Sequence, residues 1–456
     1  MWNKGETKIP TQAQNELIKR RQAGATWTSL SEWLKATYGI DIHRTNIQRW
    51  YDKEVYLDQE NEMIDPDLDP NYHIKMGKKA ETYKAEAKYF KKLYETTIKD
   101  QAKQEIFEES IMKLAPAFSK TKKVKIRKPS GKKTGDSVQS MIAPLTDTHI
   151  GDRVESDQMS GLNHYNIDIF NRRLYGWANQ VITLAEMRRN TTEVGELIVP
   201  MLGDMISGDI HEELARTNVD NCMGQMIRGA NLIAQSLMFL APHFDKVRVP
   251  CVVGNHGRMT RKPPMKDKHQ DWDYMLYQWI AAFCRDQKNI EFHIPKTFST
   301  TIEVANRQIL LTHGDFINGA GSGTAITKGI LNMRNVLQFR RGLEDEIRNL
   351  DMTEGISLLD ESGMSTYFDS VLMGHFHRID EIDIGTGNIH ICGCMKGGDE
   401  FAMQRVQAIN KPRQLVLYYH PKYGEIGKEI IYLNRYDGVN SEFNDILPEV
   451  WSQNLV

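Results

Sequence analysis

The segment Gly374-His375-Phe376-His377 directly follows the short apolar run Val371-Leu372-Met373. Four earlier segments repeat this arrangement, in which residue types that bind metals come directly after an apolar, β-branched run. These segments are Asp147-Thr148-His149 after 141–145, Gly203-Asp204 after 197–202, Gly254-Asn255-His256-Gly257 after 247–253, and His313-Gly314-Asp315 after 309–311. Short apolar runs bounded by polar residues are typical of buried strands. Because the carboxyl ends of strands in an α/β sheet form the crevice where ligands bind, we expect all five segments to converge there.

Asp, Asn and His side chains supply the oxygen and nitrogen ligands that Mn²⁺, Fe²⁺ and Zn²⁺ accept. Two such ions about 3.5–4 Å apart activate water and neutralise the oxygens of a phosphoryl group. A site of this kind needs a bridging carboxylate and several further ligands for each ion. The predicted strand ends supply this set: Asp147, His149, Asp204, Asn255, His313, His375 and His377. A single histidine at a strand end is more often a hydrogen-bonded core residue, whereas the five segments together predict a dinuclear metal site.

Length and composition limit the alternatives. The chain has 456 residues, of which 40% are hydrophobic and 26% charged, with a formal net charge of −2. This favours a water-soluble protein of two or three domains. No apolar run approaches the ~20 residues that span a bilayer, and the start Met1-Trp2-Asn3-Lys4 lacks the apolar core of a signal peptide. We therefore expect a cytoplasmic protein without membrane contacts, in the host cytoplasm if it is phage-encoded. The five sparse cysteines predict free thiols.

The order of the elements predicts an α/β fold. Helical periodicity covers 166–187 and 219–240, so strands and helices alternate through residue 255. This alternation indicates a largely parallel sheet with helices packed on it. After residue 291 strands occur in pairs, predicted at 300–304, 308–312, 382–391, 415–419 and 426–432. Two sheets that face each other between helical layers fit this pattern.

Residues 1–56 predict a small all-α domain. Helices are expected at 12–23, 26–38 and 43–51, with Ile47 and Trp50 packed inward. The outward positions of the last helix carry residue types that hydrogen-bond base edges and phosphates, namely Arg44, Asn46, Gln48 and Arg49. The segment resembles the helix-turn-helix domains found at the start of phage and transposon proteins. A helical protein-docking module is the alternative.

Residues 57–136 predict a connector. An acidic, proline-containing linker precedes a long charged helix over about 74–114, which either faces solvent or forms a homo-oligomer as a coiled coil. The following run, 120–133, is basic and without acidic residues. It predicts a flexible tether along a phosphate backbone, or else a merely solvated linker. Its candidate DNA-binding residues are Lys122, Lys123, Lys125, Arg127 and Lys128.

The order Asp-x-His, Gly-Asp, Gly-Asn-His, His-Gly and Gly-His-x-His resembles the calcineurin-like metallophosphoesterase superfamily across about residues 140–400. The resemblance implies a four-layer α/β/β/α sandwich for the domain at 137–456. It implies one ion held by Asp147, His149 and His377, and another by Asn255, His313 and His375. Asp204 would bridge the two ions, and His256 would stabilise the transition state or act as general acid. The continuation Asp147-Thr148-His149-Ile150-Gly151 is similar to the nuclease subunit of double-strand-break repair complexes and to phage-encoded repair exonucleases.

One position departs from the pattern of this superfamily. Most members follow the catalytic histidine with an acidic residue, whereas Gly257 and Arg258 follow His256 here. Without a carboxylate neighbour, His256 is expected to have a lowered pKa. Arg258 is a candidate catalytic residue that binds a phosphate through its guanidinium, with an exposed basic loop as the alternative. Asp209 is a candidate for the missing carboxylate.

The leading functional prediction is a DNA phosphodiesterase, an exo- or endonuclease in DNA repair, with two divalent ions. Mn²⁺ is the ion we expect first, with Fe²⁺, Zn²⁺ and Mg²⁺ as alternatives. The expected partners are DNA, a second copy bound through the helical connector, and a separate ATPase. Two alternatives stay open at this point. One is a phosphatase or small phosphodiesterase that acts on nucleotides or phosphoproteins, and the other is a non-catalytic DNA-binding protein.

Overall fold

The computed structural model describes residues 9, 11–40, 42–48, 50–51, 118–126, 138–317, 321–349 and 365–445. The chain divides into two compact units, Met1–Lys103 and Gln104–Val456, which are considered separately. The predicted acidic linker and long charged helix lie outside the described residues, so their boundaries stay predictions. Among the described residues, no helix is long and apolar enough to cross a membrane.

The described residues of the N-terminal unit form three helical segments, as predicted. Helix α1 is Thr11–Gln22 and α2 is Trp27–Tyr38, and residues 44–48 and 50–51 are also helical. The side chain of Thr26 accepts a hydrogen bond from the Ser29 backbone N–H at 3.2 Å and so caps the start of α2. Gly39 ends α2 at φ +67°, a conformation that glycine adopts without strain. The buried core of this unit includes Leu17, Leu30, Leu34, Ile47 and Trp50.

The C-terminal unit is built on one strongly curled sheet of 11 strands. Its first half contains β1 (Val138–Ile142), β2 (Glu193–Ile198), β3 (Lys246–Pro250), β4 (Ile290–His293), β10 (Arg413–His420) and β11 (Gly424–Tyr432). Its second half contains β5 (Ser299–Val304), β6 (Arg307–Thr312), β7 (Ser370–Met373), β8 (Ile379–Asp383) and β9 (Asn388–Cys394). The halves are joined where β10 pairs with β9 at Arg413↔Cys394 and Gln414↔Gly393. This short junction lets the halves fold over each other.

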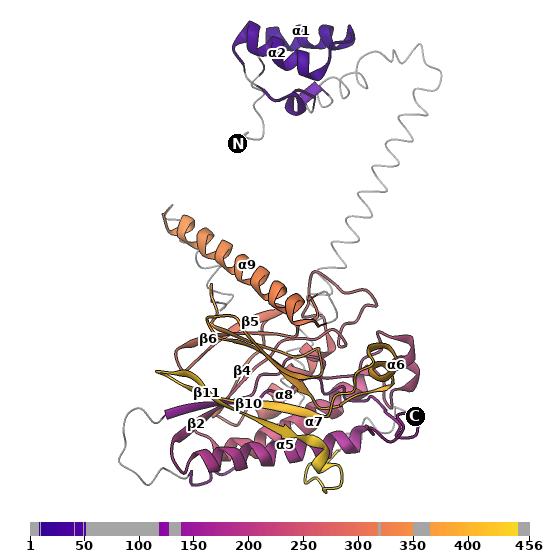
Figure 1. The fold of residues 1–456 in the computed structure, drawn as a ribbon, viewed down its shortest axis with the longest axis vertical. Coiled ribbons are helices and arrows are strands. Elements are labelled where there is room, and N and C mark those ends of the chain that lie inside the picture. The colour runs from indigo at the N-terminus through magenta and orange to yellow at the C-terminus, as the bar shows by residue number, and fades with distance from the viewer. Residues whose placement is uncertain are drawn as a thin grey trace. The chain divides into compact units, whose positions relative to one another are not determined.

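Three hydrophobic cores separate the layers. The middle core lies between the two sheet halves and includes Ile142, Ile198, Ile309, Leu372 and Leu417. A larger core packs the first half against α5 (Ile167–Arg188), α7 (Cys222–Leu240) and α8 (Trp272–Cys284). A third core packs the second half against α9 (Gly323–Asn349). Figure 1 shows α5, α7 and α8 on one side of the sheets and α9 on the other. The predicted four-layer α/β/β/α sandwich is therefore confirmed.

The direction of the strands brings the predicted site segments to one edge. Strands β1, β2, β3 and β4 run parallel to one another, and β6, β7 and β9 do so in the second half. Parallel pairing continues past the strand ends through the isolated bridges Leu145↔Met201 and Met201↔Cys251.

The short elements of this unit are α6 (Glu212–Thr217), η1 (Ala241–His243), η2 (Ala402–Val406) and η3 (Leu433–Tyr436).

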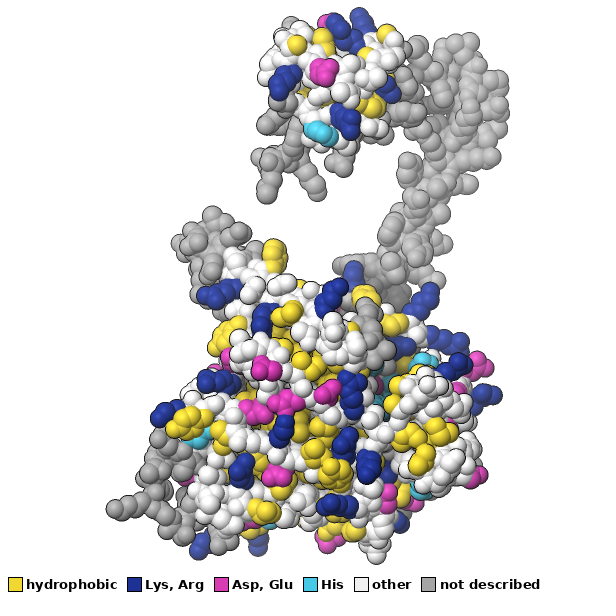
Figure 2. Space-filling model, viewed as in Figure 1, with side chains coloured by type: hydrophobic (Ala, Val, Ile, Leu, Met, Phe, Trp, Pro, Cys, Tyr) yellow, Lys and Arg dark blue, Asp and Glu magenta, His cyan; other side chains and the backbone are white. Residues whose placement is uncertain are grey.

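The basic segment differs from the expected tether over residues 118–126. It has no regular secondary structure and is held to the rest of the C-terminal unit. The N–H of Phe118 donates to the Phe283 carbonyl at 2.9 Å, and that of Val124 donates to the Pro242 carbonyl at 3.0 Å. The ring of Phe118 also stacks on Phe283. Phe118, Thr121 and Ile126 are half-buried in this stretch, which the charge run alone did not indicate. Lys and Arg side chains are spread over the face drawn in Figure 2, without a single continuous basic patch.

Candidate metal centre

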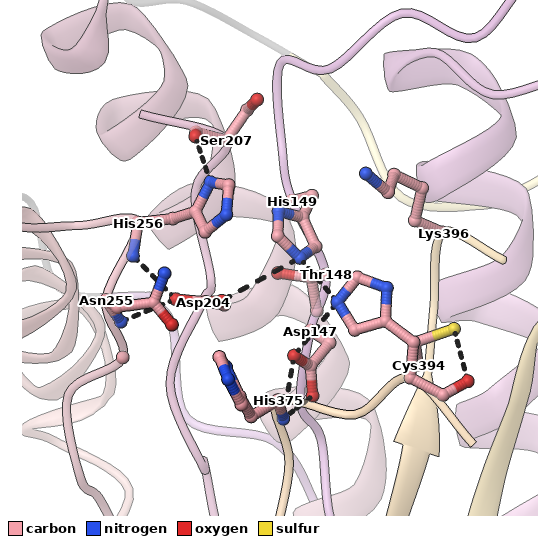
Figure 3. Close-up of polar contacts among 12 residues, drawn as sticks. Asp147, Thr148, His149, Asp204, Ser207, Asn255, His256, His375, Cys394 and Lys396 are labelled. Carbon is pink, nitrogen blue, oxygen red and sulfur yellow. Dashed lines mark hydrogen bonds and ion pairs between the residues drawn. The ribbon is translucent and has the colours of Figure 1, made fainter. Parts of the chain in front are cut away.

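The predicted ligands converge at the carboxyl edge of the sheets. Three groups of side chains have ligand atoms that all lie within 4.8 Å of one another. The groups are Asp147, His149 and His377; Asp204, His313 and His375; and His149, Asp204 and His256. They come from the loops after β1, β2, β3, β6 and β7, and Figure 3 shows several of them facing one another. The convergence expected from the strand-end pattern is thus observed, while their role as metal ligands is a proposal.

The first cluster joins the loop after β1 to the loop after β7. His377 Nε2 lies 3.3 Å from Asp147 Oδ1, and 3.0 Å from His149 Nε2. Two ring nitrogens that face each other this closely need a proton or a metal ion between them. In addition, the buried Nδ1 of His149 has no hydrogen-bond partner. A desolvated, unpaired polar atom is costly in a folded protein. The facing Nε2 atoms of His149 and His377, with the Asp147 carboxylate beside them, fit a divalent cation.

The second cluster centres on His313. Its Nε2 lies 3.1 Å from Asp204 Oδ2 and 3.2 Å from Asn255 Oδ1. Its Nδ1–H donates to the Leu202 carbonyl at 2.7 Å. Metal-binding histidines commonly donate the other ring N–H to a carbonyl in this way, which fixes the ring and leaves one nitrogen for the ion. The structure therefore presents Nε2 of His313 to the centre.

Asp204 lies between the two clusters. Its Oδ1 accepts hydrogen bonds from the backbone N–H groups of Asn255 at 2.8 Å and His256 at 2.7 Å. Its Oδ2 is 3.1 Å from His313 Nε2 and 3.9 Å from His149 Nε2. The carboxylate is thus held by one oxygen and points the other toward histidines of both clusters. This is the arrangement that a bridging ligand requires.

The loops after β2 and β3 lie so close together at Gly203 and Gly254 that neither position has room for a side chain. A Cβ on Gly203 would lie 2.4 Å from the backbone nitrogen of Gly254, and a Cβ on Gly254 would lie 2.2 Å from that of Asp204. Gly203 also has φ +86°, in the left-handed region that glycine adopts freely. Glycine at both positions lets the loops after β2 and β3 lie against each other and bring Asp204 beside Asn255.

The backbone itself is strained at the candidate ligands. Positive φ angles, which non-glycine residues seldom adopt, occur at Asp147 (50°), His149 (44°), Asp204 (50°), His375 (68°) and His377 (54°). Each such residue costs on the order of 1–3 kcal/mol, and such residues cluster at functional sites. Five strained residues in one cluster indicate that this geometry is retained for function at the expense of stability.

The electrostatics of the cluster favour a bound cation. Burial raises the pKa of Asp204, but nearby His313 and His256 outweigh burial and hold that pKa well below its usual value. Burial lowers the pKa of His313, but Asp204 outweighs burial and raises it to about 10. Burial, with His313 beside it, lowers the pKa of His375 to about 4. Without a metal ion, the charged Asp204 carboxylate thus holds a proton on His313, while His375 stays neutral. A divalent cation would take the place of that proton, and carboxylate and imidazole are donors that borderline divalent ions accept.

The raised pKa of His313 predicts a pH dependence for the metal-free protein. The protonated ring stabilises the fold fully below its unfolded pKa of about 6.5, and this contribution is lost as pH rises through about 10. We expect wild type in EDTA to lose more unfolding free energy between about pH 6 and about pH 9 than His313→Gln does, and urea unfolding at both pH values measures this difference. Equal losses in the two proteins would contradict the assigned pairing of His313 with Asp204.

His256 is oriented by a backbone carbonyl. Its Nδ1–H donates to the Ser207 carbonyl at 2.8 Å (Figure 3). Burial is the main cause that lowers its pKa, so the expected direction is confirmed. Asp209 does not supply the missing carboxylate, because its side chain is exposed and interacts with the Cys222 thiol. That expectation was wrong because a backbone carbonyl already takes the position of the orienting group.

Arg258 holds its own loop together. Its guanidinium donates to the backbone carbonyls of Asn255 at 2.7 Å, Thr260 at 3.0 Å and Arg261 at 3.1 Å. These contacts occupy Nε and both terminal nitrogens with backbone oxygens. The predicted contact of Arg258 with a phosphate stays a prediction, and the second N–H of each terminal nitrogen is not used in these three bonds.

Two buried aspartates that sequence reasoning missed lie beneath the site. Asp273 Oδ1 accepts from the N–H of Met205 at 3.1 Å, and Oδ2 accepts from the N–H of Gly254 at 3.0 Å. Asp273 therefore ties the loop after β2 to the loop after β3. Asp271 caps α8, and its Oδ1 lies 2.2 Å from the place where a side chain on Gly257 would begin. A carboxylate thus occupies the space next to Gly257, although it comes from a distant position in the chain.

A row of imidazoles leads from the buried site to the surface. The ring centroid of His256 is 4.6 Å from that of His149 and 5.7 Å from that of His211. The half-buried His377 is next to His149 at the other end of the row, with the two ring centroids 4.9 Å apart. His211 is exposed and lies just before α6. Sequence reasoning missed His211, because it follows no apolar run.

Lys396 is a buried cation beside the centre that was also missed. It follows β9, which runs parallel to β7, and only 3% of it is exposed. Its Nζ lies 2.8 Å from Asp152 Oδ2 and forms a further ion pair with Asp399. Its charge contributes, after burial, to lowering the pKa of His149. The candidate ligands were found because they follow predicted strands. Lys396 would have been found in the same way if the strand predicted at 382–391 had been extended to residue 394.

Lys396→Met is expected to reduce the free energy of unfolding by about 3–5 kcal/mol, because it leaves two largely buried carboxylates without their cation. Urea unfolding of wild type and variant measures this loss. Lys428→Met is the matched control: its lysine pairs with Glu381 but its side chain is 51% exposed, so we expect a loss of at most about 1 kcal/mol. Equal losses of unfolding free energy in the two variants would show that the buried ion pairs of Lys396 stabilise the fold no more than an exposed pair does.

The predicted DNA-binding residues are divided between the two units of the chain. In the N-terminal unit, Arg44 and Gln48 are exposed and Asn46 is half-buried, while Arg49 lies outside the described residues. In the basic segment, Lys122, Lys123 and Lys125 are exposed, and Lys123 forms an ion pair with Asp245. Arg127 and Lys128 lie outside the described residues. All five cysteines are buried free thiols, as expected.

The comparisons with known proteins find no matching family model and no matching curated protein. Similar solved structures include Vps29 from Entamoeba histolytica complexed with Zn²⁺, which is 12% identical, covers 64% of this chain and 99% of its own, and has a TM-score of 0.24. A predicted phosphoesterase from Streptococcus pneumoniae is 11% identical, covers 65% of this chain and 91% of its own, with a TM-score of 0.24. An archaeal phosphodiesterase is 10% identical, covers 64% of this chain and 99% of its own, with a TM-score of 0.24. At such low identities and TM-scores, the chemistry of the centre follows from its own side chains alone.

Proposed function

We propose that the protein is a metal-dependent phosphodiesterase that acts on DNA, as an exo- or endonuclease in DNA repair. One observation carries the metal-dependent part. Asp204 is fixed through Oδ1 and presents Oδ2 to histidines of two clusters, one with Asp147 and His377 and one with Asn255 and His313. A carboxylate between two sets of imidazole and oxygen donors fits two divalent ions.

The candidate ligands would form two sets, one for each ion. Asp147, His149 and His377 would hold one ion, and Asn255, His313 and His375 the other, with Asp204 shared. Bound ions of this class supply an activated water and neutralise the charge on phosphoryl oxygens. Mn²⁺ is our first expectation, and Fe²⁺, Zn²⁺ and Mg²⁺ accept related donor sets.

His256 would act on the leaving group. Its Nδ1–H is engaged by the Ser207 carbonyl at 2.8 Å, so Nε2 is the ring nitrogen left to hold or release a proton. His256 is packed between His149 and the exposed His211. This position, between the ligand cluster and solvent, suits a group that protonates a departing oxygen as it leaves the centre.

The N-terminal unit supports DNA as the substrate. The last helical segment buries Ile47 and Trp50 while Arg44 and Gln48 stay exposed. Arginine, asparagine and glutamine side chains are the ones that read base edges or contact phosphates. The exposed Lys122 and Lys125 of the C-terminal unit add positive charge that phosphates attract. A second copy and a separate ATPase stay expected partners.

The experiment that tests this function is cleavage of end-labelled linear and circular DNA with Mn²⁺, Mg²⁺ or EDTA. Wild type is expected to cut DNA with Mn²⁺ and to lose this activity in EDTA. Cutting of linear DNA but not of circles would identify an exonuclease. Hydrolysis of small phosphate esters without DNA cleavage would replace the nuclease by a phosphatase or small phosphodiesterase. DNA binding without hydrolysis under any divalent ion would make the protein a non-catalytic DNA-binding protein.

A further inference from the structure

A cavity of about 910 Å³ lies between α9 and the strand ends of the second sheet half. This volume falls within the range of roughly 300–1,000 Å³ that small-molecule sites occupy. Its walls include Phe298 before β5, Phe316 and Ile317 after β6, and Lys328, Asn332 and Val336 on α9. Figure 2 shows hydrophobic side chains at the surface near the base of the projecting α9. None of the residues assigned to the candidate metal centre lines this cavity.

The lining combines aromatic, apolar and cationic groups. Phe298 and Phe316 meet edge to face with ring centroids 5.7 Å apart, and 38% of Phe298 is exposed. Ile317 and Met333 form a buried apolar floor. Lys328 is an exposed cation at the wall, and no carboxylate occurs among the described residues that line the cavity. A flat, apolar ligand joined to a negatively charged group would match this lining.

The cavity is close to the candidate metal centre along the chain. Phe316 follows the ligand His313 by three residues, so their Cα atoms are at most about 11 Å apart. The intervening turn is closed by the hydrogen bond from the Ile317 N–H to the Gly314 carbonyl at 3.0 Å. Asp315 within this turn pairs with Lys268 at 3.3 Å. The wall that carries Phe316 is therefore rigidly connected to the loop that carries His313.

We propose that this cavity binds an unpaired nucleobase of the DNA strand whose phosphate lies at the candidate metal centre. The proposal rests on the proposed nuclease function and adds a subsite for the strand to it. The base stacks on the exposed face of Phe298 beside Phe316, and Asn332 offers an amide to its polar edge. Lys328 lies where it attracts the adjoining phosphate. Stacking on an aromatic side chain is sequence-tolerant and contributes substantially to the binding of single strands.

The test uses the full chain with Ca²⁺ in place of an activating ion and a labelled single-stranded oligonucleotide as the probe. Phe298→Ala is expected to weaken binding by about 5-fold to 100-fold, the range for loss of one stacked base. Phe298→Trp, which keeps an aromatic face, is expected to restore binding to within about 3-fold of wild type. Phe339→Ala is the matched control, because Phe339 is on α9, is 76% exposed and does not line the cavity.

The control variant is expected to bind within about 2-fold of wild type. Equal affinities of Phe298→Ala and Phe339→Ala would overturn the proposal. So would tight binding of an oligonucleotide with abasic sites, since it has no base to stack. A change of molecular mass in sedimentation for Phe298→Ala, without a change in DNA affinity, would assign the cavity to a second copy instead. If wild type binds no DNA, the proposed function itself fails, and this outcome is distinct from a failure of the cavity alone.

Discussion

Asp204→Asn is expected to lower the rate of phosphodiester hydrolysis by more than about 10³-fold and to reduce the bound metal per chain. The substitution keeps an oxygen that can accept from the Asn255 and His256 N–H groups, but it removes the negative charge that faces His313 and His149. A metal ion supplies several kcal/mol of transition-state stabilisation, and each 1.36 kcal/mol is about tenfold in rate. Metal analysis of purified protein and steady-state kinetics measure the two effects.

The control for this variant is Asp245→Asn, which changes a carboxylate that is 60% exposed and pairs with Lys123. It is expected to keep full activity and metal content. The apo form of Asp204→Asn should fold, because the isosteric amide retains the hydrogen bonds to the loop after β3. Unchanged metal content and activity in Asp204→Asn would contradict the proposal that Asp204 is shared by two ions.

His256→Ala is expected to lower kcat for DNA by about 10²–10⁴-fold, the range for loss of a positioned general acid. Its metal content is expected to stay at the wild-type level, because His256 is outside the assigned ligand set. The loss should be much smaller for a 4-nitrophenyl phosphodiester, since 4-nitrophenolate departs without needing a proton. Measurement of kcat for both substrates in wild type and variant shows whether the loss is larger for DNA than for the 4-nitrophenyl phosphodiester.

The matched control for His256→Ala is His243→Ala, which changes a histidine of η1 that contacts Phe239. It should leave kcat for both substrates unchanged. An equal loss of kcat for DNA and for the nitrophenyl ester in His256→Ala would show that this ring positions other groups and does not donate a proton.

The convergence of the candidate ligands was predictable from the sequence, because parallel strands place the residues that follow them at one edge of a sheet. Asp147, Asp204 and Asn255 follow runs that become adjacent parallel strands, and parallel strands end at one edge. The predicted runs extend beyond the observed strands at their carboxyl ends, for example 141–145 against β1 at Val138–Ile142. The apolar residues Leu145, Met201 and Cys251 past these strands stay buried in isolated bridges, while β2 and β3 begin with the charged residues Glu193 and Lys246. Apolar patterning therefore located the site better than it located the strand boundaries.

The supporting residues were not predictable in the same way. His256 is oriented by the Ser207 carbonyl, and a backbone group has no residue type that a sequence reveals. Asp273 reaches the site from the start of α8, through contacts with Met205 and Gly254, which are 68 and 19 residues away, that only the folded chain defines. Lys396 was missed because the predicted strand, 382–391, ends three residues before the observed end of β9 at Cys394. These groups hold the ligands in place, so their positions follow from tertiary packing.

The most direct test of the central claim is a crystal structure of the protein with Mn²⁺, recorded at a wavelength where manganese scatters anomalously. Two anomalous peaks are expected about 3.5–4 Å apart, both within ligand distance of Asp204. One peak should also contact His149 and His377, and the other His313 and His375. A single peak, or peaks remote from Asp204 in protein that still hydrolyses phosphodiesters, would contradict a dinuclear centre built from these residues.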